Sequence, residues 1–84
     1  MSELEKLKKR LKSLPRDFTY NEAKTLLTKL GFKEDNKGRT SGSRVQFEKE
    51  KDKLFFHKSH PQNILDPAVV RYLLRELTRT GDIK

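Results

Sequence analysis

The sequence predicts an α+β fold with a three-stranded antiparallel sheet, in the order helix, helix, three strands, helix. Apolar and polar residues alternate within residues 44–57, which is typical of half-buried strands. In three other segments apolar residues recur every three or four positions, as in amphipathic helices. The chain has 84 residues, enough for one small domain with a thin core, so we expect an open binding surface and no deep pocket.

Charge and cysteine content narrow the function classes. The net charge is +8 and the pI is near 9.9, and a domain this basic attracts polyanions such as RNA, or an acidic protein. The chain has no cysteine, which excludes disulfide scaffolds and zinc–thiolate sites and fits a cytoplasmic protein. No apolar run approaches the roughly 20 residues that cross a bilayer, so we expect no membrane partner.

The first predicted helix covers residues 2–13 and carries a stripe of leucines, and Pro15 limits its end. The stripe consists of Leu4, Leu7, Leu11 and Leu14. The second helix begins at a predicted capping box. In it the Thr19 hydroxyl oxygen accepts a hydrogen bond from the Glu22 amide, and the Glu22 carboxylate accepts one from the Thr19 amide. Gly31 supplies the left-handed residue that terminates this helix.

Three short strands follow the second helix. Residues 31–34 are predicted as the first, with Phe32 in the core. The inward-facing residues of the second and third strands alternate with polar ones, and they are Val45, Phe47, Leu54 and Phe56. Residues 48–53 are all charged and too polar to bury, so we assign them to the turn and its flanks. Short links between consecutive strands produce an antiparallel meander.

The last helix begins at Asp66 and Pro67, a capping carboxylate followed by a proline at the first helical position. Its core stripe consists of Val69, Val70, Leu73, Leu74 and Leu77. Three arginines four residues apart form a basic row, which is more typical of a solvated helix face than of a nucleic-acid contact. They are Arg71, Arg75 and Arg79, and Gly81 ends the helix.

The polar face of the strand pair carries the candidate functional residues. They are Arg44, Gln46, Phe55 and His57, with Lys58 and His60 just beyond the third strand. An exposed Phe55 ring among cations suits stacking on an unpaired base. The alternative is that the first helix lies over this face and buries Phe55. We favour that alternative, because the leucine stripe of the first helix has to be covered.

The sequence contains Leu-Leu-Thr-Lys-Leu-Gly-Phe at residues 26–32, Thr-Ser-Gly-Ser-Arg-Val-Gln-Phe at 40–47 and Phe-Phe-His-Lys-Ser-His-Pro at 55–61. Ile-Leu-Asp-Pro and Val-Arg-Tyr-Leu-Leu follow at the last helix. Over residues 18–83 this pattern resembles the HicA toxins of bacterial HicAB toxin–antitoxin systems. The resemblance implies a dsRBD-like α-β-β-β-α fold and metal-independent cleavage of mRNA without a cofactor. It also implies neutralisation by an acidic HicB-like antitoxin. Residues 1–17 are then an N-terminal helical extension and residues 18–84 the HicA-like domain.

One position departs from the family pattern. The family motif is Gly-Ser-His, and its histidine is held responsible for cleavage, whereas here Gly42 and Ser43 are followed by Arg44. Arginine stays charged at any working pH and cannot act as a general base. The resemblance therefore carries over the scaffold but not the catalytic residue, and it leaves open whether the protein is an endoribonuclease.

Metal-independent RNA cleavage needs a base, an acid and cations around the phosphate. Histidine suits proton transfer because its ordinary pKa is about 6.5. His57 or His60 is the catalytic candidate, while Arg44 and Lys58 would hold the phosphate. Either histidine could instead be structural, as a half-exposed strand residue or a loop cap. Two histidines are too few for a metal site, so we expect no metal.

The segment 38–42 contains two glycines and could cradle a phosphate through backbone amides. Ser43 and Arg39 are therefore counted with Phe55 among the candidate RNA-binding residues, although an ordinary connection between strands is the interpretation we favour for the loop. Two alternatives to an RNA-cleaving toxin stay open. One is a non-catalytic RNA-binding or antitoxin-binding domain on the same scaffold, and the other is an interaction module whose basic face meets an acidic protein.

Overall fold

The computed structural model describes residues 2–34, 44–57 and 64–83. Its elements are α1 (Glu3–Lys12), α2 (Tyr20–Lys29), β1 (Lys33–Glu34), β2 (Arg44–Lys49), β3 (Asp52–His57) and α3 (Pro67–Arg79). The strands form one antiparallel sheet in the order β1-β2-β3. The predicted α+β fold, with an additional N-terminal helix before the α-β-β-β-α order, is confirmed. Within the described part of the chain, no helix combines the length and apolar composition of a membrane span.

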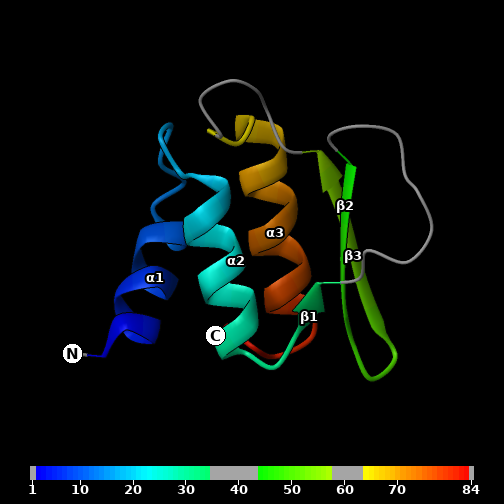
Figure 1. Ribbon diagram of the computed structural model, residues 1–84. Helices are drawn as coiled ribbons and strands as arrows, with labels where there is room; N and C mark the ends of the chain where they lie inside the picture. The colour runs from blue at the N-terminus through cyan, green and yellow to red at the C-terminus, as the bar shows by residue number, and fades with distance from the viewer. Residues whose placement is uncertain (1, 35–43, 58–63, 84) are drawn as a thin grey trace.

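The helices lie in layers on one face of the sheet (Figure 1). α2 and α3 pack next to the sheet, and α1 packs against both of them on the side that faces away from it. Leu7 and Leu11 of α1 belong to the same apolar core as the residues that face the sheet. The Leu65 amide donates to the Phe18 carbonyl at 2.8 Å and joins the segments that lead into α3 and α2. None of the described helices lies on the opposite face of the sheet (Figure 1).

The prediction that the first helix covers the outer sheet face and buries Phe55 is wrong. Leu7 and Leu11 are buried against α2 and α3, so most of the leucine stripe is covered without any contribution from the sheet. Phe55 stays 43% exposed. Leu14 leaves the predicted stripe, because α1 ends two residues before it and Leu14 turns away with φ 51° and 44% exposure.

The predicted helix caps are confirmed. The Thr19 hydroxyl oxygen accepts from the Glu22 amide at 3.1 Å, and a Glu22 carboxylate oxygen accepts from the Thr19 amide at 3.0 Å. Gly31 follows α2 with φ 102°, a conformation that favours glycine. The Asp66 carboxylate caps α3 by accepting from the Ala68 amide at 2.8 Å. These local interactions fix where the two central helices begin, and through them the position of the sheet.

β2 and β3 extend further than predicted. Lys49 pairs with Asp52 across the hairpin, so the turn consists of residues 50–51 alone. The turn thus lies within the predicted residues 48–53, but the residues on either side of it continue the strands, so the predicted turn region is too long. Lys49 continues the strand despite its charge because its side chain lies on the helix side and pairs there with Asp82. A charge with a partner can thus take an inward-facing strand position at the margin of the core.

Candidate functional site

The outer face of β2 and β3 holds three cross-strand pairs. The register places Arg44 opposite His57, Gln46 opposite Phe55 and Glu48 opposite Lys53. The β3 members of these pairs are exposed, whereas Gln46 and Glu48 are half-buried. The register thus brings Arg44 and His57 onto adjacent strands, as predicted.

The Phe55 amide shows how the backbone groups of β3 are oriented. It donates to the Tyr72 hydroxyl of α3 at 3.1 Å, so it points away from β2. In an antiparallel ladder such residues belong to the non-hydrogen-bonded pairs, whose Cα atoms lie about 4.5 Å apart and whose side chains approach most closely. Pair type alternates along the strands, so the backbones of Arg44 and His57, two positions further on, also form a non-hydrogen-bonded pair.

Lysines flank the other end of this face. In the strand register, Lys33 of β1 lies opposite Glu48 on one side, and Lys53 of β3 lies opposite Glu48 on the other. Among the side chains that the structure describes on this face, two lysines, Lys33 and Lys53, lie opposite one glutamate, Glu48, for a formal charge of +1 with His57 neutral. A shallow hollow of about 380 Å³ borders this end. The outer face is an open, positively charged surface with an aromatic ring at its middle.

The remaining candidate site residues have different outcomes. His57 ends β3 and is exposed to solvent. His60, Lys58, Ser43 and Arg39 lie outside the described residues, so their roles stay predictions. Among the residues that are described, no three His, Cys, Asp or Glu side chains gather as a metal site requires.

The arginine row on α3 is engaged within the molecule at two of its positions. Arg79 pairs with Glu76 at 3.0 Å and with Asp52 at 3.5 Å. The Arg75 guanidinium lies 5.8 Å from the centre of the Tyr72 ring. These contacts favour the interpretation of this row as a solvated helix face.

Tyr72 has a role on this face that was not predicted from the sequence. It is half-buried on α3 and satisfies the amide of Phe55 on the neighbouring edge strand. The signal that could have pointed to it is its place at the border of the apolar stripe, since a partly buried tyrosine hydroxyl needs a hydrogen-bond partner.

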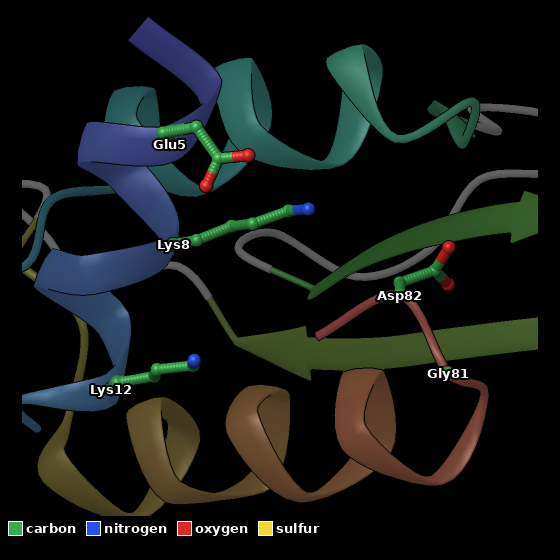
Figure 2. Close-up of a pocket in the computed structure, with 5 residues that line it drawn as sticks. All are labelled: Glu5, Lys8, Lys12, Gly81 and Asp82. Carbon is green, nitrogen blue, oxygen red and sulfur yellow. The ribbon is translucent and has the colours of Figure 1, made fainter. Parts of the chain in front are cut away.

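A second hollow lies between α1 and the segment after α3, away from the outer sheet face (Figure 2). Its volume is about 360 Å³, and its lining residues are Glu5, Lys8, Lys12, Gly81 and Asp82. Lys8 and Lys12 extend from α1 toward this segment (Figure 2). The Asp82 carboxylate is already engaged, with Lys49 Nζ at 2.7 Å and the Thr80 hydroxyl at 2.7 Å. Its mixed charges and engaged carboxylate give this hollow no specific ligand chemistry.

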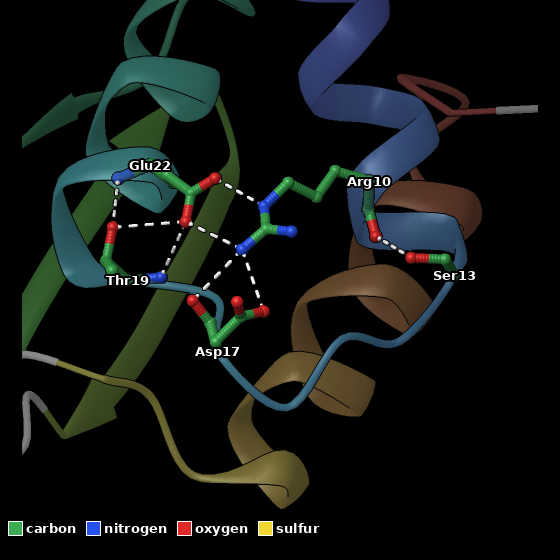
Figure 3. Close-up of polar contacts among 5 residues, drawn as sticks. All are labelled: Arg10, Ser13, Asp17, Thr19 and Glu22. Carbon is green, nitrogen blue, oxygen red and sulfur yellow. Dashed lines mark hydrogen bonds and ion pairs between the residues drawn. The ribbon is translucent and has the colours of Figure 1, made fainter.

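Arg10 attaches α1 to the start of α2 (Figure 3). Its guanidinium lies between Glu22, with Nε 2.5 Å from the carboxylate, and Asp17, with Nη2 2.9 Å from the carboxylate. Burial alone would raise the pKa of the Glu22 carboxyl, but hydrogen bonds from Arg10 and from the Thr19 amide hold that pKa below its usual value. The Glu22 carboxylate therefore both caps α2 and binds Arg10 of α1. This shared carboxylate joins the N-terminal helix to the rest of the domain.

Fold and surface together define a small basic α+β domain whose open sheet face carries a histidine, an aromatic ring and cations. The family model described as the HicA toxin of bacterial toxin–antitoxin systems matches residues 20–78. The chain belongs to this family, as the motifs of the sequence indicated. No curated protein and no solved structure matches it. The chain is accordingly a member of a toxin family whose proteins pair with an antitoxin, and α1 lies outside the matched residues.

Proposed function

We propose that the protein is an RNA-binding toxin that cleaves mRNA without a metal and uses the outer face of the sheet for both purposes. The observation that carries this proposal is the close cross-strand pairing of Arg44 with His57 at the exposed end of the hairpin. An imidazole and a guanidinium on directly opposed residues combine a proton-transfer group with a phosphate-binding group. Such a toxin would act in the cytoplasm, where mRNA is translated.

The chemistry assigns a separate role to each group. The 2′-hydroxyl oxygen attacks the adjacent phosphorus while a base takes its proton, and the P–O5′ bond breaks while an acid protonates the leaving oxygen. A 2′,3′-cyclic phosphate and a 5′-hydroxyl remain. His57 or His60 supplies proton transfer, and Arg44 with Lys58 stabilises the charge on the phosphate. Ser43 and Arg39 would add backbone and guanidinium donors for the phosphate.

A second candidate function rests on the replacement at the family motif. Arg44 follows Gly42 and Ser43 where the family has its catalytic histidine, and arginine cannot act as a general base. The alternative is therefore a non-catalytic domain that binds RNA or an antitoxin with the same face. Under either proposal an acidic HicB-like antitoxin would cover this positively charged face, and under the first it would thereby neutralise the toxin.

Incubation of the purified protein with a long RNA, with and without a chelator, separates the two candidates. We expect cleavage that the chelator leaves unchanged, and termini that carry a 2′,3′-cyclic phosphate. Loss of a proton-transfer group costs about 10²- to 10⁴-fold in rate, so His57→Ala or the His57→Ala/His60→Ala double variant should lose cleavage to that extent. Lys6→Ala, at an exposed position on α1, is the control for contaminating nuclease and for loss of a surface charge.

Two results contradict the enzymatic proposal. One is full cleavage by the double histidine variant, and the other is cleavage that the chelator abolishes. Binding without cleavage supports the second candidate. In that case the logarithm of the binding constant should fall linearly with the logarithm of the salt concentration. Arg44→Ala should make this slope shallower by the amount that corresponds to the loss of about one phosphate contact.

A further inference from the structure

Phe55 is exposed in an unusual place. It projects from the middle of a polar sheet face, with 43% of its surface accessible, while its chain neighbours Leu54 and Phe56 are buried on the opposite face. The residue directly opposite Phe55 on the neighbouring strand β2 is Gln46. The two residues form a close, non-hydrogen-bonded pair, as the orientation of the Phe55 amide toward Tyr72 indicates.

We propose that Gln46 and Phe55 form a nucleobase site, in which the Phe55 ring stacks on an unpaired base and the Gln46 amide binds the edge of that base. This inference rests on the proposed RNA-binding function and deepens it, because it makes the substrate class single-stranded RNA. A phenyl ring is a stacking platform for any base. A glutamine amide carries both donors and an acceptor, so it can distinguish bases by their edges.

The position of the pair relative to His57 supports this assignment. Phe55 lies two residues before His57 on β3, and a strand rises about 3.4 Å per residue, so the two side chains leave the same face about 7 Å apart. A base on Phe55 would then belong to a nucleotide next to the phosphate at His57. In a duplex the base faces are stacked on each other and are not accessible to a side chain, so a duplex can contact this surface through its backbone and groove edges but cannot stack on Phe55.

The Phe55 ring is also carried by a well-anchored part of the hairpin. Its amide is bonded to the Tyr72 hydroxyl, and its strand neighbours are held by the core. A site on a fixed strand loses little conformational freedom on binding, which favours its use for recognition.

The test measures binding of the full chain to 2′-O-methyl oligonucleotides, which lack the attacking hydroxyl and so cannot be cleaved. The probes are single-stranded A, C, G and U homopolymers of equal length and one hairpin duplex, compared at fixed salt by fluorescence anisotropy. Phe55→Leu should weaken single-strand binding by roughly ten-fold, as expected for the loss of base stacking. It should change duplex binding by less than about two-fold, and Phe55→Trp should retain single-strand affinity because it keeps a stacking ring.

Gln46→Ala should narrow the spread of affinities among the four homopolymers and leave their mean nearly unchanged. Circular dichroism and thermal unfolding establish that each variant is folded. Equal losses for single strands and duplex in Phe55→Leu, or no loss for either, overturn the nucleobase site. If the wild-type protein binds RNA and cleaves it while Phe55→Leu behaves like wild type, the proposed function stands and this inference alone fails. If the wild-type protein binds none of the probes and cleaves no RNA, both fail.

Discussion

Lys49 and Asp82 form an ion pair between the end of β2 and the segment that follows α3, with Nζ 2.7 Å from Oδ1. The same ammonium donates to the Leu30 carbonyl at 2.9 Å and lies 5.3 Å from the centre of the Phe32 ring. Lys49 therefore joins three segments that are distant in the sequence: the end of α2, the hairpin and the C-terminal segment. A residue assigned from sequence to a solvated turn thus has a structural role at the margin of the core.

Replacing Lys49 with methionine should destabilise the protein. The substitution keeps most of the side-chain volume but leaves the Asp82 carboxylate, with only 15% of its side chain exposed, without its cation. Hydrogen bonds to charged groups contribute about 1.5–3 kcal/mol, so we expect a loss of about 2 kcal/mol in the free energy of unfolding, measured by urea denaturation. Lys53→Met, on the exposed face of the same hairpin, is the matched control. Equal stabilities for the two variants would argue against the role of the ion pair.

Stability should fall in acid because two carboxyl groups have lowered pKa values in the folded protein. Burial alone would raise the pKa of Asp82, but hydrogen bonds from Lys49 and Thr80 hold it below its ordinary value of 3.8. The pKa of Glu22 is likewise below its ordinary value of 4.5. Both contributions are complete above these ordinary values and are lost as the pH falls through the lower folded-state pKa values.

Urea denaturation between pH 7 and pH 2.5 tests this dependence. We expect a nearly constant free energy of unfolding above about pH 5 and a decline below about pH 4.5. Asp82→Asn should be less stable than wild type at pH 7 and should show a shallower decline in acid. A decline of unchanged steepness in that variant would show that Asp82 is not one of the responsible groups.

Truncation of two leucines in the N-terminal helix region should affect stability to very different extents. Leu11 is fully buried and Leu14 is 44% exposed. Leucine-to-alanine changes in a core cost about 2–5 kcal/mol, so Leu11→Ala should lower the free energy of unfolding by that amount, whereas Leu14→Ala should change it by less than about 0.5 kcal/mol. A small effect of Leu11→Ala would mean that α1 is only loosely attached to the domain.

Tyr72→Phe tests the connection between α3 and the edge strand. The substitution removes the hydroxyl that accepts from the Phe55 amide, at an expected cost of about 1 kcal/mol. Hydrogen exchange measured by NMR should show faster exchange at Phe55 than in wild type, with little change at buried strand amides such as that of Phe47. Unchanged exchange at Phe55 would contradict this role of Tyr72.

Local sequence signals predicted the helix starts well, and they failed where distant residues decide the outcome. The Thr19 and Glu22 capping box and the Asp66 cap act over three residues or fewer, so they could be recognised without knowledge of the fold. The extension of β2 to Lys49 depends on Asp82, which lies 33 residues further along the chain. Polarity alone could not indicate that partner.

The candidate site shows the same division. Alternation of apolar and polar residues predicted that Arg44 and His57 lie on adjacent strands, and the register confirms it. The exposure of Phe55 could not be predicted in this way, because it depends on where α1 packs. The leucine stripe of α1 can pack on other helices as well as on a sheet face. The hydrogen bond between Tyr72 and Phe55 depends on α3 lying beside β3, which no local sequence pattern indicates.

The position of α1 has a practical consequence. Because α1 stacks on α2 and α3, with its first residues far from β2 and β3 (Figure 1), a label or tether attached before Ser2 would leave the outer strands accessible. Immobilising the protein through that end would present Phe55 and His57 to dissolved oligonucleotides or to an antitoxin, and the two could be compared as competitors on one surface.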